Sequence, residues 1–266
     1  MILVTNDDGI DSPGLKTLVE ALETIAPVSV AAPHAERSAI SHALTLHRPL
    51  RAEPIRERWW SVDGTPADCV LLAVKHLLEQ RPRLVVSGIN CGVNLGDDVI
   101  YSGTVAGAVE GLLHGIQSIA VSLEGRIGFD FGPAVKFSVA LAKNILDDPL
   151  PEDIMLNVNI PRAAPKNGLK WEVTRLGKRI YKTDVEVRED PRGVTYYWIG
   201  GQEPDRIEEP DTDLDCVARG IISVTPLKLD FTAYSVIEEL ETRKAAITAL
   251  TSANPPRSED AGRKSK

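Results

Sequence analysis

The chain opens with Ile2-Leu3-Val4-Thr5-Asn6-Asp7-Asp8-Gly9, and this segment sets the expectation for the whole fold. Its apolar, β-branched start is typical of a buried strand, and Asn-Asp-Asp-Gly is typical of the turn that ends one. Two adjacent carboxylates there repel each other, and burial raises the pKa of a carboxyl group unless a cation compensates. Mg²⁺ or Mn²⁺ would compensate, because both prefer oxygen ligands. A solvated turn without chemistry is an equally good interpretation of these turn residues alone.

A helix pattern follows this strand directly. Ser12 and Pro13 are typical of an N-cap and a first helical position, and apolar residues then recur at helical spacing over residues 13–25. Residues 28–32 give a second strand pattern. Strand, helix and strand with short turns make a βαβ unit, so we expect a parallel sheet. The alternation continues with strands over 59–62, 83–87 and 117–123 and helices over 66–80, 102–114 and 131–147.

The pattern changes after residue 148. Strand-like runs dominate from there, separated by charged, proline-rich loops such as residues 203–215. We therefore expect a β-rich extension or oligomerisation region after the first domain, and a final helix that could return to it. The expected units are a catalytic α/β domain over 1–148, the extension over 149–231, a helix over 232–250 and a disordered tail over 251–266; the strand-like runs are 155–160, 171–175, 194–199 and 221–225.

Composition narrows the class of protein. The 266 residues are 43% hydrophobic and 26% charged, with a net charge of −8. This charge argues against nucleic-acid and anionic-membrane partners, which require basic surfaces. Three widely spaced cysteines suggest neither a disulfide framework nor a zinc cluster. No segment is long and apolar enough for a membrane span and no signal peptide is evident, so we expect a cytoplasmic protein.

Three loops that follow predicted strands carry oxygen-bearing side chains. Ligands of an open parallel sheet bind beyond the carboxyl ends of the strands, where the strand order switches. The loops 6–9, 33–42 and 88–98 leave such ends, and Ser102-Gly103-Thr104 begins a helix whose free N–H groups can hold an anion. A cation beside a phosphate site favours phosphoryl transfer or phosphate-ester hydrolysis. The candidate ligands are Asp7 and Asp8, Ser38, and either Asn90 or Asn94.

Each candidate also has a plain structural interpretation. Ser38 could be an ordinary loop hydroxyl, Asn90 and Asn94 could be turn residues, and the start of the helix at Gly103 could be simple capping. The acidic pair Asp97-Asp98 is best interpreted as part of a solvated loop. Glycines spaced four apart from Gly103 predict close packing of that helix on a sheet. The nearby histidines, more often structural or solvated than catalytic at such positions, are His34, His42 and His47.

Several segments together resemble the SurE family of survival-protein-E-like 5′-nucleotidases. The resemblance covers residues 1 to about 250. Small departures are His34 in place of a usual Asp, Val93 in place of a usual Pro, and Cys91 at a variable position. The matching segments are Thr5–Gly9, Glu36–Ser38, Gly64–Cys69, Ser87–Asn90 with Gly92 and Asn94–Gly96, Tyr101–Val105, Leu156–Pro161, Tyr197–Gly200 and Ile222–Leu227.

The resemblance implies a phosphatase that requires one divalent metal ion per subunit, Mg²⁺ or Mn²⁺. Its substrates would be nucleoside 5′-monophosphates, with 3′-monophosphates and short polyphosphate left open. It implies a Rossmann-like three-layer domain whose β-rich extension exchanges segments between subunits of a homodimer or homotetramer. The implied metal ligands are Asp7, Asp8, Ser38 and Asn90, of which Asp7, Asp8 and Asn90 would be catalytic, and Asn94, Ser102, Gly103 and Thr104 would line the phosphate site.

The expected mechanism is attack by metal-activated water, because no Ser or Cys has the setting of an activated nucleophile. Asp8 is the better candidate for handling the proton. The rival is a non-enzymatic, Mg²⁺-binding, receiver-like phosphosensor, which would need an acceptor Asp where the third loop has Ser87 and Asn90. A haloacid-dehalogenase-type phosphatase would need Asp-x-Asp instead of adjacent aspartates. Multiple turnover separates the enzyme from the sensor.

Overall fold

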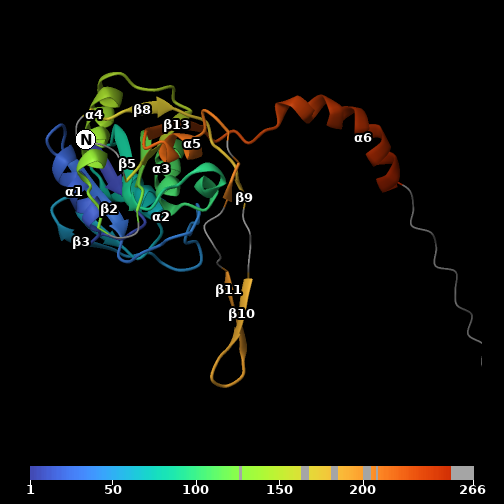
Figure 1. Cartoon of the computed structure of the whole chain (residues 1–266), viewed down its shortest axis with the longest axis horizontal. Coiled ribbons are helices and arrows are strands. Elements are labelled where there is room, and N and C mark those ends of the chain that lie inside the picture. The colour runs from blue at the N-terminus through green and yellow to red at the C-terminus, as the bar shows by residue number, and fades with distance from the viewer. Residues whose placement is uncertain (126–127, 163–167, 181–184, 200–204, 208, 253–266) are drawn as a thin grey trace, which may run out of the picture. The chain divides into compact units, whose positions relative to one another are not determined.

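The computed structural model describes residues 1–125, 128–162, 168–180, 185–199, 205–207 and 209–252. A central sheet runs through the part of the chain that contains β2, β5 and β13 (Figure 1). Among the described residues it has nine strands, in the order β3-β4-β2-β1-β5-β6-β7-β13-β8. The strands from β4 to β7 are parallel, whereas β3 and β13 are antiparallel to β4 and β7. The bounds are β1 Ile2–Thr5, β2 Val28–Pro33, β3 Ala52–Arg56, β4 Trp59–Val62, β5 Leu84–Cys91, β6 Gln117–Leu123, β7 Ile154–Ile160, β8 Trp171–Val173 and β13 Ile222–Lys228.

Strand β1 lies in the middle of this sheet. All four of its residues are buried, as expected for a parallel strand covered on both faces. Ile2 pairs with Val28 of β2 on one side and with Leu84 of β5 on the other. The chain passes first to one side of β1 and later to the other, so the strand order switches between β1 and β5. The predicted βαβ unit and parallel sheet are confirmed.

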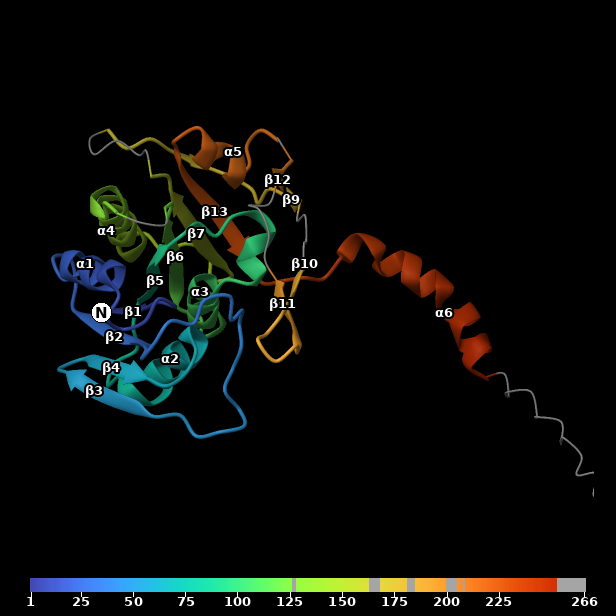
Figure 2. The same ribbon diagram turned by 60° about the horizontal axis from the view of Figure 1, so that its bottom comes forward.

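Helices cover both faces of the sheet and make three layers (Figure 2). Helices α1 (Pro13–Leu22) and α4 (Gly132–Asp147) pack on the face that carries Ile2 and Val4. Helix α2 (Pro66–Leu72) packs on the opposite face, which carries Leu3 and Val85, and contacts α3 (Gly103–Leu113). The predicted α/β fold of the Rossmann-like class is therefore confirmed.

The glycine stripe of α3 lets this helix approach the sheet closely. A Cβ atom on Gly107 would lie 2.8 Å from Ser87 Oγ and 2.8 Å from Thr5 Cγ2. Gly103 and Gly111 are similarly confined, by Asp7 and by Ser118. Close packing of this helix on the sheet is confirmed, and it brings the start of α3 to the end of β1.

Two local predictions need correction. The capping box of α2 is present, with Thr65 and Asp68 exchanging hydrogen bonds, but the α-helix ends at Leu72 and not at residue 80. A π-helical turn, η1 (Ala73–Leu77), follows it, and Pro82 stands shortly beyond, where a helix cannot continue. The apolar positions over residues 44–50 suggest an edge strand or an extended arm; no strand forms there, and β3 begins later and pairs with β4.

The range 149–231 contributes to the central sheet as well as to separate ribbons. Strands β7, β13 and β8 all come from it and join the sheet. Two antiparallel ribbons are made by β10 (Val185–Glu189) with β11 (Thr195–Ile199) and by β9 (Arg179–Ile180) with β12 (Asp205–Arg206). The segment interpreted as a charged loop contains β12 and the start of α5 (Asp213–Ala218), which Thr212 caps through its side chain.

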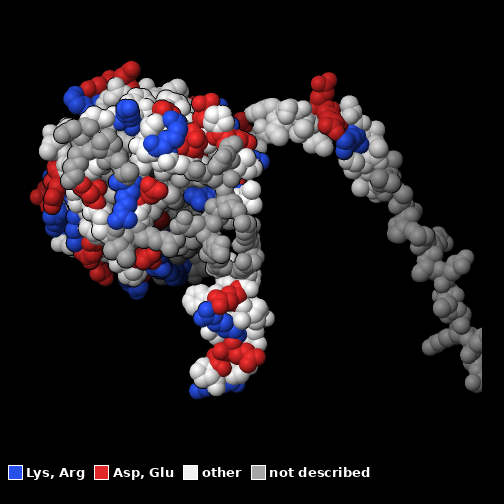
Figure 3. Space-filling model, in the orientation of Figure 1, with Lys and Arg blue, Asp and Glu red and all other residues white. Residues whose placement is uncertain are grey.

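The described residues from Asp230 to Ser252 belong to a second unit. Within it, the predicted final helix is present as a 3₁₀ turn, η3 (Tyr234–Val236), followed by α6 (Ile237–Ser252). Of the predicted tail over 251–266, residues 253–266 lie outside the described part of the chain. No helix within the described ranges is long and apolar enough to cross a membrane. On the face shown in Figure 3, acidic and basic side chains are intermixed.

Candidate active site

A cavity of about 420 Å³ opens at the carboxyl ends of β1 and β5. It lies at the switch in strand order, where open α/β sheets bind ligands. The structure brings together Asp7, Asp8, Ser38 and Asn90, the four predicted metal ligands, with two of the predicted phosphate-site residues. The full lining is Asp7, Asp8, Glu36, Ser38, Ala39, Asn90, Cys91, Val93, Asn94, Asp98, Tyr101 and Ser102.

Asp7 is held at the start of α3. Its side chain is 4% exposed, and the Thr104 hydroxyl donates to Asp7 Oδ1 at 2.5 Å. A Cβ atom on Gly103 would lie only 2.8 Å from the Asp7 Cβ, so glycine is required for this approach. Burial raises the pKa of Asp7 from 3.8 to about 6, although the hydrogen bonds from Thr104 oppose the rise. Thr104 and Gly103 therefore contact Asp7, and they are not among the described residues that line the cavity.

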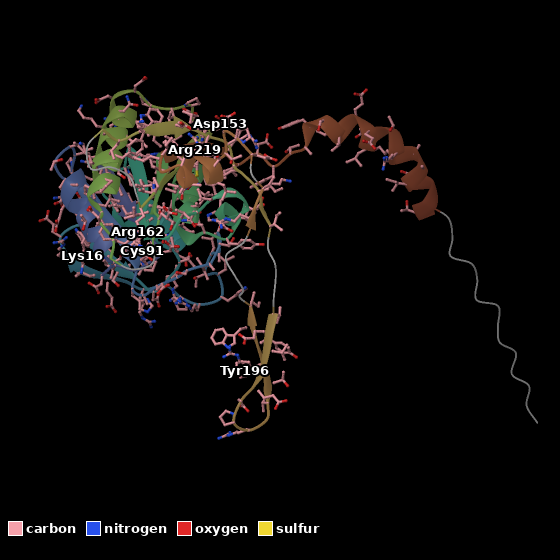
Figure 4. The ribbon with its side chains drawn as sticks, in the orientation of Figure 1. Lys16, Cys91, Asp153, Arg162, Tyr196 and Arg219 are labelled. Atoms are coloured by element: carbon pink, nitrogen blue, oxygen red, sulfur yellow. The ribbon has the colours of Figure 1, made fainter. Side chains whose placement is uncertain are left out.

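Asp8 is more open to the cavity than Asp7. Its Oδ2 accepts the backbone N–H of Cys91 at 3.1 Å, a contact between the ends of β1 and β5. Burial raises the pKa of Asp8, the Cys91 hydrogen bond lowers it, and the charge of Glu36 raises it further. Cys91, labelled in Figure 4, lies at the end of β5. Burial and the charge of Asp8 raise the pKa of its thiol to about 12, so it is no thiolate nucleophile at neutral pH.

Ser38 lies in the loop after β2, and several bonds tie this loop to the site. Its hydroxyl donates to Glu36 Oε1 at 2.7 Å, and the Arg37 N–H donates to the Asp7 carbonyl at 2.7 Å. Further along, Ser41 bonds the backbone at Tyr101 and at Ile100. The loop therefore approaches Asp7 and crosses the segment just before α3.

The three histidines near the site in sequence, His34, His42 and His47, differ in their contacts. All three are exposed, and His42 Nε2 lies 2.8 Å from Oε2 of Glu110, a side chain of α3 that is 6% exposed. None of the three is among the described residues lining the cavity. His42 is therefore a further tie between the loop and α3.

The loop after β5 supplies Asn90 and Asn94. Asn90 Nδ2 donates to the Gly92 carbonyl at 2.8 Å, which leaves the amide oxygen for a cation. Asn94 is buried, and its side-chain amide donates to Ser122 Oγ at 2.8 Å. Ser102 accepts the Val105 N–H as the N-cap of α3 and also lines the cavity.

The lining has the donor chemistry of a divalent cation site. Four carboxylates line the cavity, and no Lys, Arg or His is found among its described lining residues. Uncompensated carboxylates raise each other's pKa, and a bound cation would remove that penalty. No group of three or more His, Cys, Asp and Glu side chains in the described ranges could hold a metal. The side chains that could bind a cation are therefore of mixed type: the carboxylates of Asp7 and Asp8, the Ser38 hydroxyl and the Asn90 amide. Such oxygen ligands suit Mg²⁺ or Mn²⁺.

Sequence reasoning missed residues that only the fold brings to the cavity wall or to the loop after β5. Asp98, interpreted as part of a solvated loop, lines the wall and pairs with Arg179 at 2.7 Å. Asp213 of α5 accepts the Gly96 N–H at 2.7 Å, and burial raises the pKa of that carboxyl group. Asp98 carried a weak signal, because acidic pairs in long glycine-rich loops are often functional. Asp213 carried none.

Known proteins resemble this chain in sequence and in fold. A family model described as survival protein SurE matches residues 2–183. The chain belongs to the SurE family. The 5′-nucleotidase SurE of Moorella thermoacetica is 50% identical over 245 residues, covering 90% of this chain and 94% of that protein. The 5′-nucleotidase SurE of Myxococcus xanthus is 50% identical over 241 residues, covering 90% and 91%. The crystal structure of the SurE protein from Aquifex aeolicus matches with a TM-score of 0.81 and 44% identity, covering 91% of this chain and 99% of that one.

Proposed function

We propose that this SurE family member is a 5′-nucleotidase that hydrolyses nucleoside 5′-monophosphates to nucleoside and phosphate. The observation that carries the proposal is the acidic, oxygen-lined cavity at the ends of β1 and β5, with Asp7 and Asp8 in its wall. A small phosphate ester fits a cavity of about 420 Å³. The curated relatives that share most of this chain carry the name 5′-nucleotidase SurE.

The cation of this enzyme would be held by Asp7, Asp8, Ser38 and Asn90, one ion per subunit. When bound, it supplies Lewis acidity toward the phosphoryl oxygen and lowers the pKa of water. Asp7 is the fixed member of the set, because Thr104 and α3 hold it in place. Ser38 belongs to the set through the loop that Arg37 and Ser41 anchor.

The remaining polar groups act on the substrate. Asp8 is half-buried, and only its Oδ2 accepts the Cys91 N–H, so Oδ1 is the atom that takes a proton from the attacking water. Ser102, the N-cap of α3, and Asn94, in the loop after β5, line the cavity and hold the phosphate. Gly103 and Thr104 contribute through Asp7. No protein nucleophile is needed, and the Cys91 thiol remains protonated.

The exposed aromatic ring of Tyr101 lies beside Ser102 in the cavity wall and is 59% exposed. It is placed to stack on the nucleobase of a bound nucleotide. Nucleoside 3′-monophosphates and short polyphosphate present the same terminal phosphate, so they are secondary substrates in this proposal. The mixed charges seen in Figure 3 differ from the basic surface that binds nucleic acid.

The β10–β11 hairpin is the proposed contact between subunits of a homodimer or homotetramer. Tyr197 pairs with Val187 across it, and these side chains are 65% and 59% exposed. Trp198 and Ile199 are exposed next to them, and Tyr196 of the same strand is labelled in Figure 4. Such apolar area is typical of an interface. Light scattering on wild type and on the Tyr197→Ser variant tests this, and a monomeric wild type would contradict it.

The deciding experiment measures phosphate release from AMP and GMP with Mn²⁺, with Mg²⁺ and with EDTA. Wild type should turn over many times with metal and stop in EDTA, and Asp8→Asn should be inactive in both. Asp97→Asn is the matched control, because Asp97 is not among the described lining residues. Steady release from Asp8→Asn in EDTA would overturn the mechanism. Stoichiometric phosphate uptake without turnover would favour the receiver-like sensor.

A further inference from the structure

Two buried asparagines of β7 hold the backbone of Asn94. Asn159 Oδ1 accepts the Asn94 N–H at 2.8 Å, and Asn159 Nδ2 donates to the Asn94 carbonyl at 3.0 Å. Asn157 Nδ2 donates to the same carbonyl at 2.8 Å. Both asparagines have no exposed surface, so these bonds are shielded from water. Three buried bonds therefore converge on one residue of the loop after β5.

The geometry of β7 explains why both side chains reach the loop. Residues 157 and 159 are two apart on one strand, so they point to the same face of the sheet. Leu156, Val158 and Ile160 point to the other face and join the main core. Polar side chains replace apolar ones only on the face that carries the loop, at the end of β7 nearest the cavity.

An unsatisfied atom indicates that this arrangement serves more than stability. Asn157 Oδ1 is buried and has no hydrogen-bond partner within the described ranges. A buried polar atom without a partner is costly, and native proteins contain few of them. A leucine would fill the same space without that cost. The amide is therefore used for what its nitrogen does, which is to bind the Asn94 carbonyl.

We infer that Asn157 and Asn159 are positioning residues for phosphate binding, acting through Asn94; the inference rests on the proposed function. Held at its N–H and at its carbonyl, Asn94 has both flanking peptide groups fixed, and its side chain stays in the cavity wall. The bond from Asn94 Nδ2 to Ser122 Oγ fixes the side chain in turn. A preformed phosphate contact avoids the cost of ordering the loop when the substrate binds.

The test compares Asn159→Leu and Asn157→Leu with a control at a neighbouring position. We expect Asn159→Leu to raise KM for AMP and the inhibition constant of inorganic phosphate together, by about tenfold. Asn157→Leu loses one bond and should raise both by about threefold. The Mn²⁺ activation constant should not change, because neither asparagine contacts the proposed metal ligands. Ser223→Ala is the control: Ser223 pairs with Asn159 across the strands but bonds Thr174, and both constants should stay unchanged.

A double-mutant cycle shows whether the effect passes through Asn94. In the Asn94→Ala background, Asn159→Leu should have no further effect on KM or on phosphate inhibition. An undiminished effect there, or an equal rise in the Mn²⁺ constant, would overturn the inference. Asn157→Leu leaves the bond from the Asn94 N–H intact, because that N–H donates to Asn159. This variant therefore tests the inference if Asn159→Leu does not fold.

Calorimetric binding of inorganic phosphate in the presence of Mn²⁺ separates this inference from the proposed activity. A wild type that binds phosphate but hydrolyses no nucleotide would overturn the activity alone. The inference would then stand if Asn159→Leu weakened phosphate binding by about tenfold. It would fail if both proteins bound phosphate equally.

Discussion

The hydroxyl of Thr104 donates a 2.5 Å hydrogen bond to Asp7 Oδ1, which joins the start of α3 to the end of β1. The two residues are 97 positions apart in the chain. The start of a helix favours a negative charge, and here the charge comes from the protein's own carboxylate. Asp7 is thus kept in place by a helix whose own position depends on Gly103 and Gly107.

Removal of this hydroxyl should impair catalysis. Bonds to a charged group contribute about 1.5 to 3 kcal/mol, so Thr104→Val should lower kcat/KM by roughly 10- to 100-fold. Thr104→Ser keeps the donor and should retain most of the activity. Steady-state kinetics with AMP measure both variants. Equal activity of the valine variant and wild type would show that Asp7 needs no such support.

The buried charge of Asp7 should destabilise the metal-free protein as pH rises. Its pKa is about 6 in the folded state against 3.8 ordinarily, so the folded state binds the proton more tightly. The contribution of Asp7 to the free energy of unfolding is therefore most favourable below pH 3.8. It falls between pH 3.8 and about 6 and is constant at higher pH. About two pKa units correspond to a loss on the order of 3 kcal/mol.

Urea unfolding in EDTA at pH 4 and pH 8 measures that loss. Asp7→Asn keeps an oxygen for Thr104 and has no charge to bury, so its stability should depend less on pH by that amount. Acids that do not interact with Asp7 contribute equally in both proteins and cancel in the comparison. Identical pH dependence in the two proteins would contradict the prediction. Mn²⁺ should restore the wild type at pH 8 and have a smaller effect on the variant.

A methyl group at Gly103 should disturb Asp7 directly. In Gly103→Ala the new Cβ would lie 2.8 Å from Asp7 Cβ and 2.9 Å from Oδ2, so the helix or the carboxylate must move. We expect at least a tenfold loss of kcat/KM, together with about 1 to 3 kcal/mol of stability. Gly107→Ala is the matched control, because its Cβ would meet Ser87 and Thr5 at 2.8 Å instead. Gly107→Ala should lose similar stability and keep more activity than Gly103→Ala. A lower kcat/KM for Gly107→Ala than for Gly103→Ala would contradict the prediction.

Tyr101 should matter for nucleotides and not for phosphate esters that lack a base. Stacking of a base on an aromatic ring contributes about 1 to 3 kcal/mol, so Tyr101→Ala should raise KM for AMP by roughly 5- to 100-fold. KM for ribose 5-phosphate, which has no base, should stay close to that of wild type. Parallel changes for both substrates would mean that Tyr101 shapes the cavity without contacting the base.

Local sequence patterns were sufficient for the alternation of strands and helices and for one part of the site. Residues 2–9 carry both the buried strand and the acidic turn, and strand ends in a parallel sheet face one edge. Asp7, Asp8, Ser38 and Asn90 therefore could be placed together before the fold was known, and they do line one cavity. Prolines and capping residues marked where helices start, but α2 ends earlier than predicted, because a π-helical turn follows it at Ala73.

The tertiary structure alone supplied the residues that hold the site in place. Asn157 and Asn159 reach Asn94 because β7 lies beside β6, and Asp213 reaches Gly96 across 117 positions of the chain. Arg179 pairs with Asp98 in the same way. Such contacts leave no periodic or local signal, because strand order and side-chain direction create them. Short-range chemistry along the chain thus specifies which groups can react, whereas long-range packing specifies how rigidly they are presented.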